Sequence, residues 1–175
     1  MYLLSIISFL LLAGFLLLAA MRFGVPSMVS DVYYQLQNCA GSEVVGDKRK
    51  QNYGWVFTAV MVTCAILMMV CMLDTGNGVQ FLAFIGCVGL MFVGFAPNYL
   101  DADDYTIHKV GALVAAIGCV GWCMSVCWVP TAVITLIYLL LVSCSDDDER
   151  YKPVWYMAEV AGFLDVYITY WVCAS

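Results

Sequence analysis

Residues 54–73 read GWVFTAVMVTCAILMMVCML, a run of twenty residues without a charged side chain. An α-helix rises about 1.5 Å per residue, so a helix of this length covers about 30 Å, the thickness of the hydrocarbon core of a bilayer. The run therefore predicts a transmembrane helix, and the rest of the chain can be compared with it.

Five other stretches have the same apolar character. They are residues 2–21, 79–97, 106–125, 130–144 and 154–173. The run 130–144 has only about 15 residues, so its helix must thin the bilayer locally or recruit residues of the loops. We therefore predict an all-α fold, a polytopic integral membrane bundle of six transmembrane helices that forms a single domain over residues 1–175.

The composition supports a membrane protein and excludes other classes. Hydrophobic residues make up 64% of the chain, charged residues only 11%, and the mean hydropathy is +0.91, whereas soluble domains carry about 25% charged residues. The net charge of −6, with no basic stripe, argues against nucleic-acid binding.

Residues 2–21 lack the basic region of a signal peptide and are longer than its apolar core, so we expect a retained first helix.

The positions of the basic residues predict the topology. All seven lie in or beside the connections 22–53, 98–109 and 145–153, whereas the breaks 74–78 and 126–130 contain no Lys or Arg. If every apolar run crosses the bilayer, the three basic connections share one side, which the positive-inside rule makes cytoplasmic. Both termini then lie on the opposite side.

The first connection contains a short amphipathic pattern. Met28, Val32 and Leu36 recur at helical spacing after Pro26, with polar residues between them. This pattern predicts a surface helix over 27–37, parallel to the membrane, with these three side chains turned inward.

The third and fourth runs are rich in small residues, which allow helix backbones to approach closely in a membrane. We expect close packing at Gly86, Gly89, Gly94, Gly111, Ala115, Gly118 and Cys119.

Two carboxylates lie inside the last run. Counted from Pro153, Glu159 is about 9 Å deep and Asp165 about 18 Å deep, near the midplane. A charge there costs at least about 2.5–3.5 kcal/mol, so both should face protein or water. Two roles are open for each carboxyl. It could belong to a proton, cation or ligand site, with Tyr167 as a hydrogen-bonding neighbour. It could instead form a structural hydrogen bond between two helices. For Asp165 we predict burial and donation to a tyrosine hydroxyl or a backbone carbonyl.

No motif indicates a metal, cofactor or catalytic site, and we expect none. A single histidine, His108, cannot supply the several ligands of a ceramidase-like zinc site or a two-histidine haem clamp, and no nucleophile motif accompanies it. The acidic run 146–149 and the acids at 101–104 could gather a divalent cation, but solvated acidic loops are the simpler interpretation.

We expect the cysteines of the apolar runs to be free and packed as small hydrophobes: Cys64, Cys71, Cys87, Cys119, Cys123, Cys127 and Cys173.

Two short segments resemble a known group. The segment 25–31, VPSMVSD, follows the first run, and 108–112, HKVGA, opens the fourth after 95–97, FAP. Together they are similar to elements of the DUF998 and Frag1/DRAM/Sfk1 group of six-span membrane proteins. The resemblance implies a six-span architecture with links to lipid handling and membrane organisation. It also implies that Ser30, Asp31 and His108 share one rim, where His108 could pair with Asp31 or an acid of 101–104.

These observations predict a non-enzymatic, lipid-binding or membrane-organising protein, with membrane lipids, a second copy or another membrane protein as partner. The alternative is a small transporter or channel subunit that uses Asp165 and Glu159.

Overall fold

The computed structural model describes residues 1–38, 53–98, 100, 102–143 and 153–174, and within them every regular element is a helix. The all-α prediction is therefore confirmed. The helices are α1 (Tyr2–Phe23), α2 (Asp31–Asn38), α3 (Gly54–Asp74), α4 (Gln80–Phe95), α5 (Ala102–Val126), α6 (Trp128–Ser143) and α7 (Val154–Thr169), which continues as the π-helix η1 (Tyr170–Ala174).

Three of these helices are long and apolar enough to cross a membrane. They are α1, α3 and the part of α5 from Asp104 to Val126. The helices α4 and α6 are apolar but have only 16 residues each, or about 24 Å of rise. The predicted run 79–97 ends as a helix at Phe95, because Pro97 disfavours the helical conformation of the residue before it.

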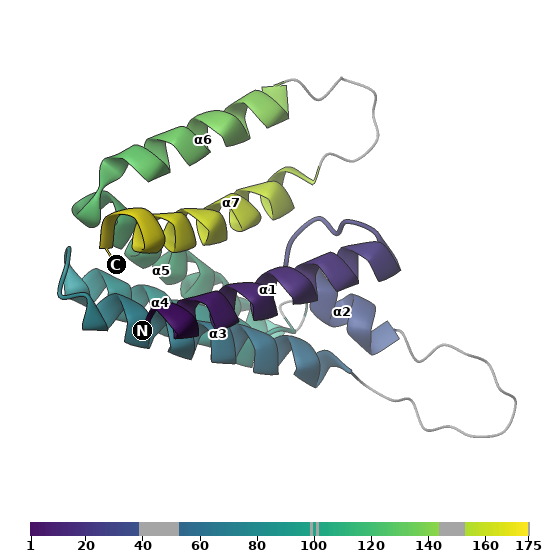
Figure 1. Cartoon of the computed structure of the whole chain (residues 1–175). Coiled ribbons are helices and arrows are strands. Elements are labelled where there is room, and N and C mark those ends of the chain that lie inside the picture. The colour runs from purple at the N-terminus through teal and green to yellow at the C-terminus, as the bar shows by residue number, and fades with distance from the viewer. Residues whose placement is uncertain (39–52, 99, 101, 144–152, 175) are drawn as a thin grey trace, which may run out of the picture.

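The helices alternate in direction along the bundle (Figure 1). The start of α1 and the end of η1 lie at one end of the molecule, whereas the end of α1, α2, the end of α6 and the starts of α3 and α7 lie at the other. Two hydrogen bonds place the α4–α5 connection at that second end as well: the Tyr34 hydroxyl of α2 donates to Asn98 Oδ1 at 3.1 Å and accepts the Leu100 N–H at 2.8 Å. We call this second end the rim.

The pair α4 and α5 makes the closest backbone contact of the bundle. A Cβ atom added at Gly118 would lie 2.5 Å from Gly86 Cα, and one added at Gly89 would lie 2.5 Å from the Ala115 nitrogen. Real Cβ atoms do not approach so closely, so only glycine fits at these positions. The predicted small-residue contact is confirmed, and it includes Gly111.

The surface helix of the first connection is shorter than predicted. It begins at Asp31 rather than at residue 27, because residues 27–30 form a turn. The Asp31 carboxylate stabilises this turn by accepting the Met28 N–H at 3.1 Å and the Ser27 hydroxyl. Of the three residues expected to face inward, Val32 is fully buried, and Met28 and Leu36 are half-buried.

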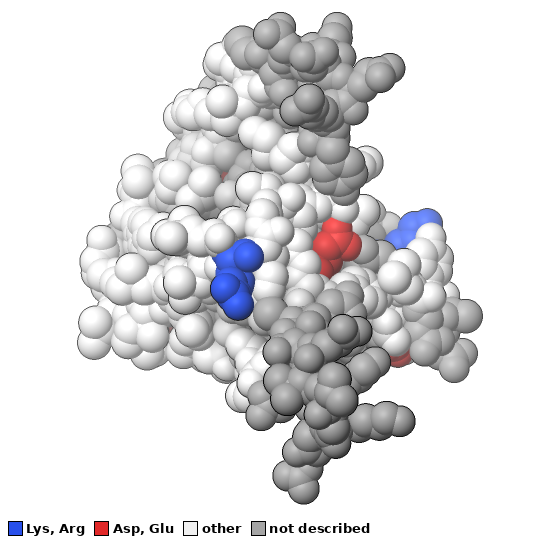
Figure 2. Space-filling model, turned by 90° about the vertical axis from the view of Figure 1, so that its right-hand side faces the viewer, with Lys and Arg blue, Asp and Glu red and all other residues white. Residues whose placement is uncertain are grey.

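Much of the outer surface is apolar. In α6 only Pro130 and Thr131 are buried, whereas its remaining length exposes large aliphatic side chains such as Leu136, Ile137 and Leu140. Among the described residues of the rim face, Figure 2 shows a few separate charged side chains. The exposed apolar surface of α6 suits lipid rather than water.

The α4–α5 contact gives a stability prediction. Gly118→Ala should lower the free energy of unfolding by about 1–3 kcal/mol, because the added methyl group forces the two backbones apart. Gly14→Ala is the matched control: it lies in a helix with nothing within 4 Å of an added Cβ, so it should be neutral or stabilising by about 0.5–1 kcal/mol. Thermal unfolding in detergent micelles measures both, and equal melting temperatures would contradict the packing argument.

Candidate functional site

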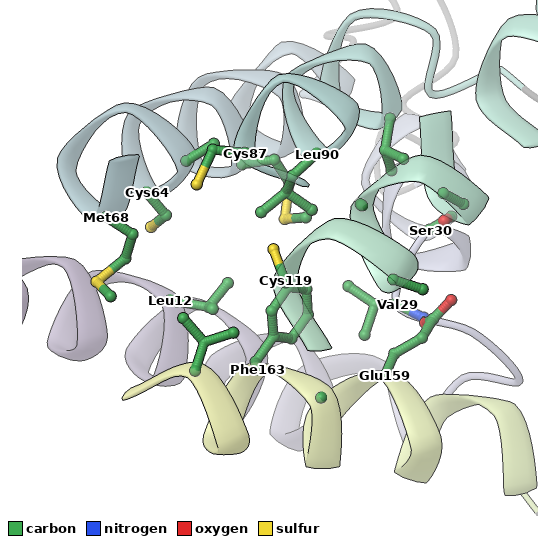
Figure 3. Close-up of a pocket in the computed structure, with 18 of the residues that line it drawn as sticks. Leu12, Val29, Ser30, Cys64, Met68, Cys87, Leu90, Cys119, Glu159 and Phe163 are labelled. Atoms are coloured by element: carbon green, nitrogen blue, oxygen red, sulfur yellow. The ribbon is translucent and has the colours of Figure 1, made fainter. Parts of the chain in front are cut away.

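A cavity of about 430 Å³ lies between the helices (Figure 3), and it is lined by residues of α1, α3, α4, α5, α7 and the turn before α2. Its walls are almost entirely apolar or sulfur-containing. Among the lining residues are Leu12, Cys64, Met68, Cys87, Leu90, Cys119 and Phe163. The cavity has the size and the apolar lining of a small-molecule binding site.

One end of the cavity is polar. Glu159 and Ser30 both line it, and Figure 3 shows them at the same end, away from Met68. The Glu159 carboxylate accepts the Val29 N–H at 2.5 Å. A second bond, from the Tyr156 N–H to the Ser27 carbonyl at 2.9 Å, attaches the start of α7 to the same turn. The polar end is therefore formed where α7 meets the turn of residues 27–30.

His108 holds this turn from the other side. Its Nε2 lies 3.0 Å from Ser30 Oγ, and its Nδ1 lies 2.8 Å from the Ala96 carbonyl oxygen. A carbonyl can only accept, so Nδ1 carries the proton. In the neutral ring Nε2 is then an acceptor, and the Ser30 hydroxyl donates to it. The buried imidazole thus links α5 to the α4–α5 connection and to the turn before α2.

The structure brings His108 to Ser30, the chain neighbour of Asp31, and the described side chain that hydrogen-bonds to the His108 ring is Ser30. Asp31 is the first residue of α2, and its carboxylate folds back onto Ser27 and Met28. Of the alternative acidic partners, Asp104 is described and lies close enough to His108 to interact with it electrostatically. Asp101 and the side chain of Asp103 lie outside the described residues, as does the acidic run 146–149.

Tyr167 is buried, lines the cavity and joins three helices. Its hydroxyl lies 2.7 Å from Ser8 Oγ, and the Ser8 hydroxyl donates to the Cys64 carbonyl at 3.3 Å. Because Ser8 has one proton to give, Tyr167 is the donor of its bond to Ser8. Sequence reasoning named Tyr167 but not Ser8, although Ser8 is a rare polar residue within the first apolar run.

Asp165 occupies a separate place. It is 3% exposed and is not among the residues that line the cavity. Its Oδ1 accepts the hydroxyls of Thr131 at 3.1 Å and Thr169 at 3.3 Å. The prediction of a buried, hydrogen-bonded Asp165 is confirmed, but the partners are threonine donors rather than a tyrosine or a carbonyl. Asp165 thereby anchors α6 to α7, whereas Glu159 belongs to the cavity.

The cysteines have the role expected of them. The six whose state the structure describes are free, and four of these, Cys64, Cys71, Cys87 and Cys123, are buried.

Comparison with known proteins gives no further guide, since no family model, curated protein or solved structure matches this chain.

The anchoring role of Asp165 can be tested with two substitutions. Asp165→Asn keeps an oxygen that accepts both threonine hydroxyls, so the melting temperature should change little. Asp165→Leu removes the acceptor and should cost about 1–3 kcal/mol of the free energy of unfolding, because buried hydroxyls lose their partner. Thermal unfolding of both variants in the same detergent decides the matter, and equal destabilisation would show that the charge rather than the hydrogen bonds is needed.

Proposed function

We propose that this protein is a membrane-embedded lipid-binding protein that holds a single-chain amphiphile in its internal cavity. The observation that carries the proposal is the shape of the cavity lining: apolar along the bundle and polar at the end formed by Glu159 and Ser30. An acyl or alkyl chain would lie between Met68 and Phe163, with its head group at the polar end. The resemblance to six-span proteins linked to lipid handling supports the same class of function.

The proposal places the six helical runs across a bilayer. Three helices have the necessary length and hydropathy. The shorter α4 and α6 are apolar, and α7, the sixth, has 16 residues and continues as η1. Local thinning of the bilayer would accommodate about 24 Å of helix. On this arrangement the rim carries the basic connections 22–53, 98–109 and 145–153 and faces the cytoplasm, α2 lies along the membrane surface, and both termini are on the opposite side.

Accessibility labelling tests this topology. In a chain whose native Cys39, Cys144 and Cys173 are changed to Ser, cysteines introduced one at a time into residues 41–50 and at the C-terminus should react with a membrane-impermeant maleimide from opposite sides of sealed vesicles. The loop should react from the cytoplasmic side and the C-terminus from the other. Labelling of both positions from one side would contradict the six-span arrangement.

A second experiment tests whether the cavity is occupied. Gly162 lines the cavity, and a Cβ added there would have nothing within 4 Å. Gly162→Leu should therefore fill part of the cavity without straining the fold and should reduce bound amphiphile severalfold. Native mass spectrometry of the purified protein, or extraction of its lipids, measures this loss.

The matched control for this experiment is Gly14→Leu. Gly14 also lies in a helix with open space around its Cα but does not line the cavity, so this variant should retain the wild-type amount of amphiphile. Equal lipid content in the two variants would contradict the cavity as the binding site.

Transport or channel activity is the second candidate, and the buried carboxyl of Asp165 is what favours it. If protons or cations pass through this site, Asp165→Asn should fold normally and abolish transport in vesicles. Its threonine partners and its separation from the cavity lining favour the anchoring role.

A further inference from the structure

The residues at the polar end of the cavity indicate which chemical class of head group it would bind. This inference rests on the proposed lipid-binding function. Among the described residues that line the cavity, Glu159 supplies the one Asp, Glu, Lys, Arg or His side chain. Asp31, in the same turn region, adds a second carboxyl nearby. The described charged groups at this end are therefore acidic, and they carry negative charge when ionised.

The nearest described basic residues do not offset this charge at the cavity. Lys109 follows His108 in the chain, but it is exposed and its Nζ lies 5.5 Å from the centre of the Tyr105 ring. Arg22 is exposed at the end of α1, and neither residue lines the cavity. An anionic head group would lie against Glu159 without a cation from the described lining.

The hydrogen-bonding capacity of the two polar side chains points the same way. Glu159 accepts the Val29 N–H through Oε2, and its Oε1 forms no hydrogen bond with the described residues. Because the Ser30 hydroxyl gives its proton to His108, the lone pairs of Ser30 Oγ remain as acceptors. As a carboxylate, Glu159 thus offers an acceptor beside that of Ser30, and a head group with N–H or O–H donors can satisfy both.

We propose that the cavity selects a long-chain amine or amino alcohol, whose ammonium group pairs with Glu159 and Ser30, over fatty acids and other anionic lipids. A charge-assisted N–H···O bond is about twice as strong as a neutral one, and a nearby ammonium group favours the ionised form of the Glu159 carboxyl. A neutral long-chain alcohol also supplies a donor and should bind more weakly than the amine. A carboxylate or phosphate head group would meet both electrostatic repulsion and unpaired acceptors.

The test uses the full chain in nanodiscs of a zwitterionic phospholipid at pH 7.4. Three probes share one brominated sixteen-carbon chain and end in an amine, a hydroxyl or a carboxylate. Bromine quenches tryptophan fluorescence at short range, and Trp155 lines the cavity. Trp155 is also 67% exposed on the outer surface, so binding in the cavity is reported by quenching that is lost both in Trp155→Phe and in the cavity-filling Gly162→Leu.

The expected order of affinity is amine, then alcohol, then carboxylate. Glu159→Gln still offers a side-chain oxygen to the Val29 N–H, so it should fold; it should weaken amine binding about ten- to hundredfold and change alcohol binding little. Asp165→Asn is the control that removes a buried carboxyl outside the cavity, and it should change none of the three affinities.

Two different failures can be distinguished. If the alcohol binds but the amine binds no better, or if Glu159→Gln leaves the affinity for the amine unchanged, the head-group inference is overturned while lipid binding stands. If none of the three probes quenches Trp155, the cavity is not an amphiphile site and both proposals fail.

Discussion

Polar groups that lie away from water must find partners within the protein, and in this bundle that constraint decides which helices meet. Nearly all side chains of α1 are apolar, and apolar side chains gain little by choosing one helix over another in lipid. Its serines supply the specificity. Ser8 bonds to Tyr167 of α7 and to the Cys64 carbonyl of α3, and Ser5 accepts the Trp171 N–H at 2.9 Å.

The same constraint operates at both ends of the bundle. Asp165 and its threonine partners attach α6, which has few other buried contacts. At the rim, His108 and Glu159 fix the turn before α2 from α5 and α7. A few buried polar side chains therefore define the packing of helices whose apolar surfaces are nearly interchangeable.

Small residues explain how a tightly packed bundle also contains a cavity. Glycines on α4 and α5 bring those two backbones into contact. Three alanines of α5, Ala112, Ala115 and Ala116, line the cavity, where they leave space that larger side chains would fill. The polar end of this space comes from the same bonds that hold the rim together, so binding and folding share Glu159 and Ser30. A ligand at this end would stabilise the junction of α7, α5 and the first connection.

The sequence by itself determined the helical class, the approximate limits of the apolar helices, the small-residue contact and the burial of Asp165. These follow from local rules: apolar length, the absence of bulky side chains, and the cost of a carboxyl in an apolar environment. Only the tertiary structure decided that Glu159 lies with Ser30 at the cavity while Asp165 pairs with Thr131, and that His108 bonds Ser30 instead of Asp31. Such pairings depend on how the helices rotate and cross in the bundle. The spacing of residues along one helix determines which of them share a face, but it does not determine which helix that face contacts.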